Sequence, residues 1–501
     1  MIPLVGWHFG GPVVRPRAQG VAAWFGQPTW SAGQLLRDLE MRLGLPPSEA
    51  AAAVRVPVYA RRLAAVMKDE PFFSRSFTAD ALGTAKTLLA WRDALLDAGW
   101  TGQSVADGGD RLDSLAAVEA CDEEALPAGR ADRLVRVETE LRAVRQQPYD
   151  GLALAEPRDL WSARWRAIFG LLEERGVAIE QLAPELAQAP AESDLGILQR
   201  MLRGELAPRR TGDPPAIRGD GTLRLVHGDT PAELAELTAG FLARQTDSAT
   251  VVRCAESGTL DAALGHHGLA CQGHAGSSAW RPAMQLLPLA LELSYEPRDP
   301  YRVLELLTLP VGPFQGALGA QLARAVSRQP GVGGSEWKRQ KDKGAERLRE
   351  WRLRHGLEAG KSQEDATRDA DAFVAERMQR VADWVEAAGF GPEGAPRRAL
   401  LEVTERVRTL LQRRLAVSPE GGETYGAAHA QAQAMTDALA RDHRETLTRE
   451  QMRNVLDGVV RGEQSVGLMP EQAGRIDHVD HPGALLAPSD TVVFWAFVGG
   501  T

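Results

Sequence analysis

Residues 251–310 read VVRCAESGTLDAALGHHGLACQGHAGSSAWRPAMQLLPLALELSYEPRDPYRVLELLTLP. The stretch opens with a short apolar run, Thr250–Arg253, and continues into a helical pattern at 259–264. Two similar runs, 223–226 and 491–498, have the length and composition of buried strands. Short apolar strands that alternate with helices are typical of α/β units with a parallel sheet. We expect 491–498 to pair with 250–253, because a lone apolar strand needs a neighbour to satisfy its backbone.

The same alternation occurs earlier in the chain, where an apolar run at 151–155 precedes a helical pattern within 156–176. Helical spacing also marks 67–100, 365–389 and 398–415, and from about 318 to 467 the pattern is helical throughout. The segment 206–221 is rich in Pro, Gly and Arg and is the best candidate for a linker. The expected parts are an α/β part at 1–205, a linker at 206–221, a second α/β part at 222–317 and 467–501, and a helical insertion at 318–466. The final strand ends abruptly at 499–501, which suggests a fragment of a longer chain.

Composition indicates a globular protein with more than one core. The chain has 501 residues, of which 44% are hydrophobic and 25% charged. Its three cysteines lie far apart, which argues against a disulfide framework or a zinc site and fits a reducing cytoplasm. The N-terminus lacks a secretion signal, and no apolar run is long enough to cross a bilayer. We therefore expect a cytoplasmic protein with no membrane partner.

Two groups of segments carry a resemblance to a known family. The first group lies in the quoted stretch and just after it: Val251–Arg253, Gly268–Ala270, Arg298–Pro300, Leu306–Pro310 and Pro330–Gly334. The second lies near the N-terminus: Ser31–Glu40, Phe73–Phe77, Ala90–Asp93, Ala98–Trp100 and Trp161–Gly176. In order and spacing, the first group resembles the second RecA-like domain of superfamily 1 helicases. Together, the two groups resemble the inactivated helicase region of AddB/RecB-like repair nucleases of the PD-(D/E)XK family.

The resemblance covers nearly the whole chain and implies a helix-rich α/β fold. It predicts two RecA-like helicase domains of the P-loop NTPase type, with an all-helical insertion in the second. Residues 1–205 would then form the first domain (1A/1B-like), and 222–317 with 467–501 the second (2A-like, truncated at its C-terminus). Residues 318–466 would form the insertion (2B-like).

A functional P-loop requires the pattern G-x-x-x-x-G-K-[ST], so the six lysines of this chain permit an exhaustive search. Only Lys86 and Lys361 precede a Ser or Thr. Lys86 lies inside a strong helical pattern, and the Gly356–Ser362 segment is one residue too short and has no strand before it. The resemblance places the P-loop near Gln27–Gln34, which contains no lysine. The P-loop motif is therefore missing.

The second ATPase element is an apolar strand that ends in a metal-binding Asp followed by Glu. At the matching position Ala155 replaces that Asp, and Arg158 replaces a Gln that superfamily 1 helicases carry. Glu156 and Asp159 remain. Arg253 matches the family position that would touch the γ-phosphate, and we interpret it as structural. Because a methyl group cannot hold Mg²⁺, we expect no ATP hydrolysis and no cofactor.

Residues 474–480, GRIDHVD, superficially resemble a strand of RecB-type nucleases. That chemistry also needs a lysine downstream, and none follows Lys361. His478 and His481 have a spacing that could ligate zinc, but no Cys or HExxH partner lies near. We therefore expect no nuclease site and no metal within this chain.

The strongest local feature is the basic stretch 337–355. It contains three acidic residues (Asp342, Glu346, Glu350) and eight basic ones: Lys338, Arg339, Lys341, Lys343, Arg347, Arg349, Arg352 and Arg354. Dense cations suit DNA phosphates, and Trp337 and Trp351 could stack on bases. The alternative is a solvated helix held by pairs such as Glu346–Arg349 and Glu350–Arg354. The net charge of the whole chain, −9, favours neither reading, so local charge has to decide.

The expected function is that of a non-hydrolysing helicase-like module in a double-strand-break repair helicase-nuclease. Such a module binds a DNA end or single strand and supports an active motor or nuclease subunit. Two alternatives stay open. The chain could be the front part of a nuclease whose catalytic domain lies beyond residue 501, or a helical scaffold that binds only protein.

Overall fold

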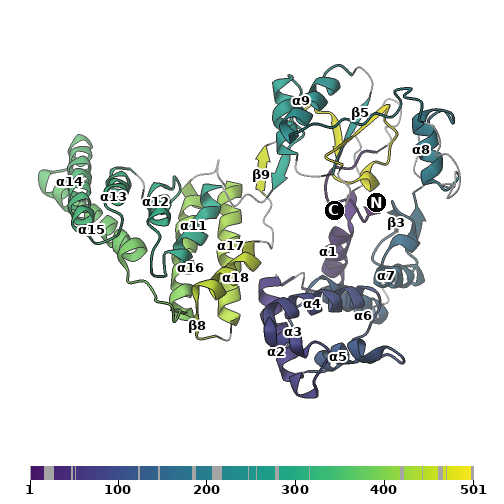
Figure 1. Cartoon of the computed structure of the whole chain (residues 1–501), viewed down its shortest axis with the longest axis horizontal. Coiled ribbons are helices and arrows are strands. Elements are labelled where there is room, and N and C mark those ends of the chain that lie inside the picture. Colours follow the sequence, from purple (N-terminus) through teal and green to yellow (C-terminus); the bar gives the residue numbers. More distant parts are fainter. Residues whose placement is uncertain are drawn as a thin grey trace.

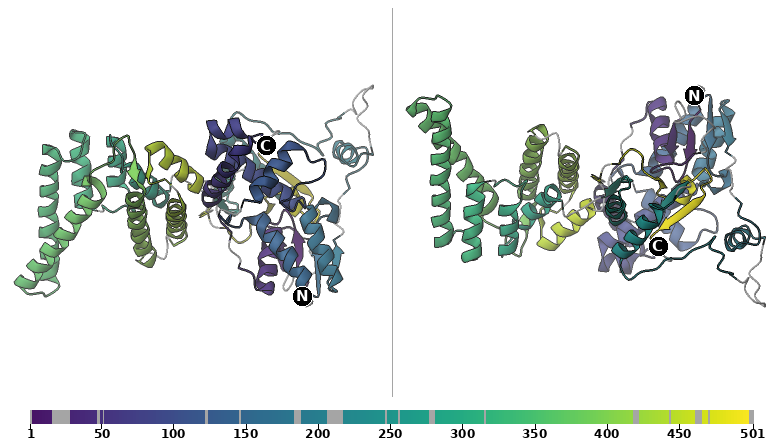
Figure 2. Two further views of the ribbon diagram at one scale, coloured as in Figure 1. Left: turned by 90° about the horizontal axis from the view of Figure 1, so that it is seen from below. Right: turned by 90° about the horizontal axis from the view of Figure 1, so that it is seen from above.

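The computed structural model describes residues 2–15, 28–46, 49–50, 52–121, 124–144, 147–182, 188–205, 217–245, 248–254, 257–276, 281–314, 316–417, 422–442, 444–460, 466–469 and 471–497. The fold is helix-rich α/β with small parallel sheets, as expected. A helical unit extends away from an α/β part, and this arrangement is plain in all three ribbon views (Figures 1 and 2). Most of the proposed linker, residues 206–216, lies outside the described residues.

The first sheet has the strand order β2-β1-β3-β4, and every pairing in it is parallel. Its strands are β1 (Leu4–Gly6), β2 (Thr29–Ser31), β3 (Gly151–Leu154) and β4 (Ala178–Gln181). Three helices share a hydrophobic core with it: α1 (Ala32–Leu43), α6 (Arg130–Ala143) and α7 (Ala163–Glu174). Trp165 and Phe169, one turn apart on α7, are fully buried in this core. The apolar run at 151–155 and the helix after it are therefore confirmed.

The helices between α1 and α6 in the chain form a layer with its own hydrophobic core. Its members are α2 (Ala52–Ala65), η1 (Met67–Asp69), α3 (Ser74–Ala79), α4 (Ala81–Asp97) and α5 (Gly109–Glu119). Asp80 caps α4 by accepting a hydrogen bond from the Gly83 N–H. Arg92, which is buried, forms ion pairs with Asp132 at 2.6 Å and Glu119 at 3.0 Å, so the charges inside this layer are compensated.

The second sheet has the order β10-β5-β11 and joins distant parts of the sequence. Its strands are β10 (Asp477–Val479), β5 (Ala249–Arg253) and β11 (Thr491–Trp495). Both outer strands run parallel to β5, with Val493 opposite Val251. The predicted pairing of 491–498 with 250–253 is thus confirmed. Helices α9 (Pro231–Leu242) and α10 (Gly258–His266) pack on this sheet, and α8 (Asp194–Leu202) precedes it in the chain.

The strand expected at 223–226 is absent, and this prediction was wrong. Leu225 is 91% exposed and Val226 is 58% exposed. The segment belongs to no ladder. Apolar composition alone therefore does not place a run in a sheet.

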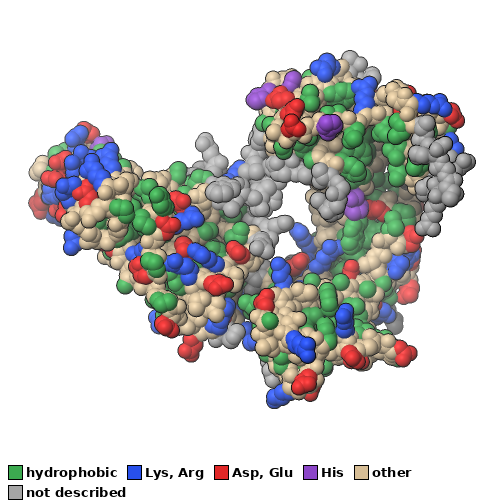
Figure 3. Space-filling model, viewed as in Figure 1, with side chains coloured by type: hydrophobic (Ala, Val, Ile, Leu, Met, Phe, Trp, Pro, Cys, Tyr) green, Lys and Arg blue, Asp and Glu red, His purple; other side chains and the backbone are tan. Residues whose placement is uncertain are grey.

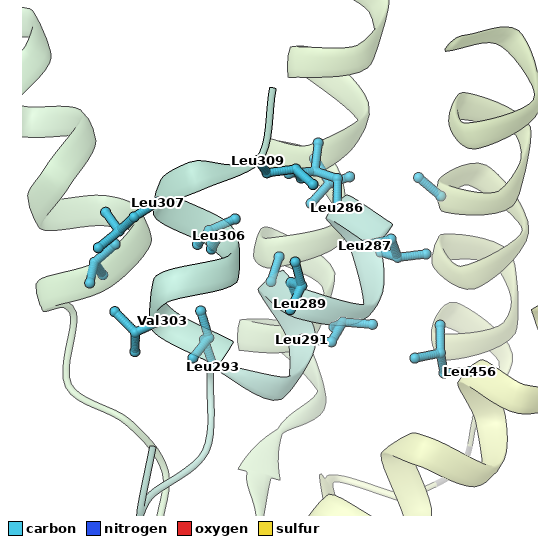
Figure 4. Close-up of a cluster of buried hydrophobic side chains, with 14 of the residues drawn as sticks. Leu286, Leu287, Leu289, Leu291, Leu293, Val303, Leu306, Leu307, Leu309 and Leu456 are labelled. Atoms are coloured by element: carbon cyan, nitrogen blue, oxygen red, sulfur yellow. The ribbon is translucent and has the colours of Figure 1, made fainter. Parts of the chain in front are cut away.

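The helical unit contains eight α-helices among the described residues. They are α11 (Pro282–Glu292), α12 (Pro300–Thr308), α13 (Ala317–Arg328), α14 (Ser335–Glu358), α15 (Gln363–Val381), α16 (Arg397–Val417), α17 (Gly422–Arg441) and α18 (Arg449–Val460). Leu287 and Leu291 of α11 lie on the side of Leu456 of α18, while Leu307 of α12 points to the opposite side of the unit (Figure 4). All four belong to one buried cluster. One continuous core therefore begins at Pro282, and the boundary we drew at 318 falls inside a packed unit.

Small β elements complete the fold. Inside the helical unit, β7 (Ala395–Pro396) pairs with β8 (Thr446–Leu447), so this region is not purely helical as expected. The strands β6 (His274–Gly276) and β9 (Val466–Met469) pair antiparallel where the chain enters and leaves the unit. A parallel bridge also joins Val14 to Leu485, and a small apolar cluster lies between the two main sheets.

Candidate functional site

The first candidate site lies where the ends of β1 and β3 meet, because the resemblance places an ATP site there. Glu156, just after β3, accepts hydrogen bonds from the backbone N–H groups of Trp7 and His8 in the loop after β1. The Trp7 nitrogen is 3.0 Å from both carboxylate oxygens. Backbone N–H groups at the end of a strand are the groups that hold phosphate in nucleotide-binding loops. In this chain a carboxylate of the protein satisfies them.

Ala155 is buried and belongs to an apolar cluster with members from both sheets. The cluster contains Leu4 and Phe9 from the first part, and Val252 and Val479 from the second. Hydrocarbon therefore fills the space between the strand ends. Such packing stabilises the contact between the sheets, and it supplies no oxygen ligand for Mg²⁺.

Arg253 extends from the end of β5 into the same junction. Its guanidinium pairs with Asp480 at 2.5 Å and donates to the carbonyl of Gly273, also at 2.5 Å. Gly11 lies against this pair, and a Cβ there would collide with the Asp480 carboxylate. The structural interpretation of Arg253 is consistent with these contacts, which leave its charge fully compensated.

His478 and His481, the two residues with possible zinc-ligand spacing, have different surroundings. The His481 ring stacks on His8, with centroids 3.5 Å apart. His478 is 2% exposed on β10, and its Nδ1 atom has no hydrogen-bond partner. Burial, together with the nearby Arg253 and Arg475, lowers the pKa of His478 to about 4. No group of three or more His, Cys, Asp or Glu side chains is placed to share a metal ion within the described ranges.

The other nucleotide candidates fall elsewhere. Lys86 is an exposed residue of α4, and Lys361 lies in the turn between α14 and α15, as expected. Residues 28–34, the described part of the expected P-loop position, enter β2 and the first turn of α1. The loop that contacts Glu156 is a different one, which follows β1. Asp159 is exposed in η2 (Arg158–Leu160) and makes no ion pair among the described residues.

The second candidate site is the basic helix, since 337–355 lies entirely within α14. Lys and Arg side chains gather over α14 and α15 at the far end of the helical unit, with Asp and Glu among them (Figure 3). The helix is amphipathic, with Gln340 and Gly344 buried on its inner face. The sequence predicted its helical form correctly.

Trp337 cannot stack on a base, so this part of the expectation was wrong. Its ring is 2% exposed in the core of the helical unit, and its indole N–H donates to Glu386 at 2.7 Å. Trp351 differs, because it is 45% exposed and its ring lies beside the rings of His355 and Phe373. The two positions are 14 residues apart, about four turns, so they lie on nearly the same face of α14. The difference in exposure therefore comes from how much of the helix its neighbours cover at each end, and not from the helical period.

Part of the positive charge of α14 is neutralised within the unit. Lys341 pairs with Glu386 at 2.7 Å, and Arg352 pairs with Asp369 at 3.0 Å. Arg339 pairs with Glu336, and Arg349 pairs with Asp371 rather than with Glu346. Four cations of the helix have no acidic partner in the part of the chain that the structure describes: Lys338, Lys343, Arg347 and Arg354. These four, all exposed, are the residues left to meet a phosphate backbone.

The structure also adds residues that the sequence reasoning missed. Arg377 and Arg380 of α15 and Arg414 of α16 lie close together near the middle of α14. Phe373, Arg377 and Arg380 are spaced i, i+4 and i+7, so they share one face of α15. That spacing was visible in the sequence, but we searched only the densest run of charge.

A scan against protein-family models finds no match, and comparison with curated proteins finds none. Across the described residues, no helix is both long enough and apolar enough to cross a membrane.

Proposed function

We propose that this chain is the non-hydrolysing, helicase-like module of a helicase-nuclease that repairs DNA double-strand breaks. Its two α/β parts would be RecA-like domains, with the helical unit inserted in the second. It would bind a DNA end or single strand and support an active motor or nuclease subunit.

The observation that carries the proposal is the contact of Glu156 with the loop after β1. A parallel sheet in which a strand-end loop meets the end of the neighbouring strand is the setting of a nucleotide site in α/β folds. Here the loop N–H groups are satisfied by Glu156, Ala155 replaces a metal ligand, and Arg253 is paired with Asp480. These three features support a module that would not hydrolyse ATP.

DNA binding is supported by the four unpaired cations of α14. Exposed lysines and arginines release counterions when they meet phosphates, which favours binding to any DNA sequence. The rival function is a scaffold that binds only protein. It is favoured by the four other cations of α14, because their charges are neutralised by ion pairs within the helical unit.

A titration of labelled DNA at several salt concentrations tests the proposal. A DNA-binding module shows affinity that falls linearly on logarithmic axes as salt rises. Absence of binding at low salt would reject DNA binding and leave the scaffold.

A further inference from the structure

A groove opens on the helical unit where the start of α13 meets the middle of α14 and α15. Its volume is about 320 Å³, and Phe314, Leu318 and Leu348 give it an apolar floor. Three arginines from two helices line it: Arg347 of α14, and Arg377 and Arg380 of α15. The groove is therefore apolar at its base and cationic around it.

Two of the three groove arginines, Arg347 and Arg377, have no acidic partner among the described residues. Glu376 is the nearby carboxylate, and it pairs with Arg380 at 2.5 Å. Arg377 is half-buried and makes no ion pair among the described residues. Burial, together with Arg380 and Arg414, lowers the pKa of the Arg377 guanidinium. Like charges held this close destabilise the site unless an anion lies between them.

The aromatic residues at the groove differ in what they can still contact. Arg352 and Arg377 lie over the Phe373 ring, at 5.2 Å and 4.8 Å from its centroid. Trp351 also lines the groove and remains 45% exposed. A planar ligand would therefore meet Trp351 rather than Phe373.

We propose that this groove holds one unpaired nucleotide of a DNA strand, with its phosphate at Arg347, Arg377 and Arg380 and its base against Trp351. The inference rests on the proposed function and makes it specific, since it selects single-stranded over duplex DNA. Cations beside an exposed aromatic ring are the usual elements of single-strand binding. In a duplex the bases are paired and stacked, so they cannot reach Trp351. The uncapped N-terminus of α13, at Gly316, adds partial positive charge on the same side.

The test compares binding of a fluorescent oligothymidine and a fluorescent hairpin duplex to the full chain. We expect the double variant Arg347→Gln/Arg377→Gln to weaken oligothymidine binding by roughly tenfold or more, while duplex binding changes by less than about twofold. Trp351→Ala should weaken oligothymidine binding by roughly five- to a hundredfold and leave its salt dependence unchanged. The matched control is Arg368→Gln/Arg398→Gln, which removes two exposed arginines of α15 and α16 outside the groove and should change neither affinity.

The outcomes separate the two proposals. Equal losses for both DNAs, or no loss for either, would overturn the groove assignment while DNA binding stands. A wild-type chain that binds neither DNA would reject the proposed function itself. If the double variant does not fold, Arg347→Gln and Trp351→Ala alone decide, because both side chains are exposed.

Discussion

The carboxylate of Glu156 lies 3.0 Å from the backbone nitrogen of Trp7, measured from either oxygen. The two residues are 149 positions apart in the sequence, and their contact joins the end of β3 to the loop after β1. A carboxylate of the protein thus satisfies the backbone N–H groups of this loop. Under the proposed function, a metal ligand restored at position 155 alone would not free this loop for a phosphate, because Glu156 would still occupy it.

Glu156 should therefore contribute to stability. We expect Glu156→Ala to lower the free energy of unfolding by about 1–3 kcal/mol, since a charge-assisted bond to backbone N–H is lost. Glu156→Gln keeps an acceptor oxygen and should lose less. Thermal melting checks the order, with Glu173→Ala as the control, because Glu173 makes an exposed pair with Arg158. Equal melting temperatures for the two alanine variants would contradict this role.

His478 should make the second sheet sensitive to acid. Its folded pKa of about 4 lies below the ordinary value of 6.5, so the unfolded chain binds the proton more readily. The contribution of His478 to the free energy of unfolding is constant above pH 6.5. It falls as the pH drops toward 4, by up to about 3 kcal/mol. The variant His478→Leu should lose this component. Urea unfolding at pH 7 and pH 4.5 measures it, and an identical pH dependence in wild type and variant would show that His478 is not the cause.

DNA affinity should depend on the cations of α14 that have no acidic partner among the described residues. We expect Lys338→Glu/Lys343→Glu to weaken DNA binding and to reduce the slope of log affinity against log salt by about 1.4–1.8 units, since each phosphate contact adds roughly 0.7–0.9. The matched control is Lys68→Glu/Lys86→Glu, which makes the same charge change at two exposed lysines of the α/β part. Equal effects of the two double variants would mean that only net charge matters.

The two tryptophans of α14 should have opposite phenotypes. Trp337→Ala removes a buried ring and should destabilise the helical unit by about 3–5 kcal/mol. Trp337→Phe should lose less, because it gives up the bond to Glu386 but keeps most of the volume. Trp351→Ala should leave the melting temperature nearly unchanged. A large loss of stability in Trp351→Ala would place this residue in the core and remove it from the DNA surface.

Local sequence patterns predicted the helices and strands of this fold better than they predicted which of these elements lie side by side. The sequence predicts the pairing of 491–498 with 250–253 because the backbone N–H and C=O groups of a buried strand need partners. That need can be read from the strand itself. The run at 223–226 has similar composition but pairs with no strand, and whether a run joins a sheet depends on the whole fold. The loop that contacts Glu156 was missed for a related reason. It carries no recognisable motif, and only the adjacency of β1 and β3 reveals it.

The candidate DNA surface shows the same limit. Charge density located α14, but the sequence could not tell which cations would find partners on α15 and in the segment after it. Glu386 illustrates this, since it receives both Lys341 and the indole of Trp337 from 45 or more residues away. Helical spacing could not have separated Trp337 from Trp351, because 14 residues are about four turns. It could have pointed to Arg377 and Arg380.

The central claim is that the chain binds DNA and does not hydrolyse ATP, and one experiment measures both. Labelled oligothymidine is titrated with the protein, with and without Mg-ATP, while phosphate release is followed in the same samples. The account predicts saturable, salt-sensitive DNA binding, the same isotherm in both conditions, and no phosphate release above the level without protein. DNA-stimulated phosphate release that a non-hydrolysable ATP analogue abolishes, or the absence of any DNA binding at low salt, would contradict it.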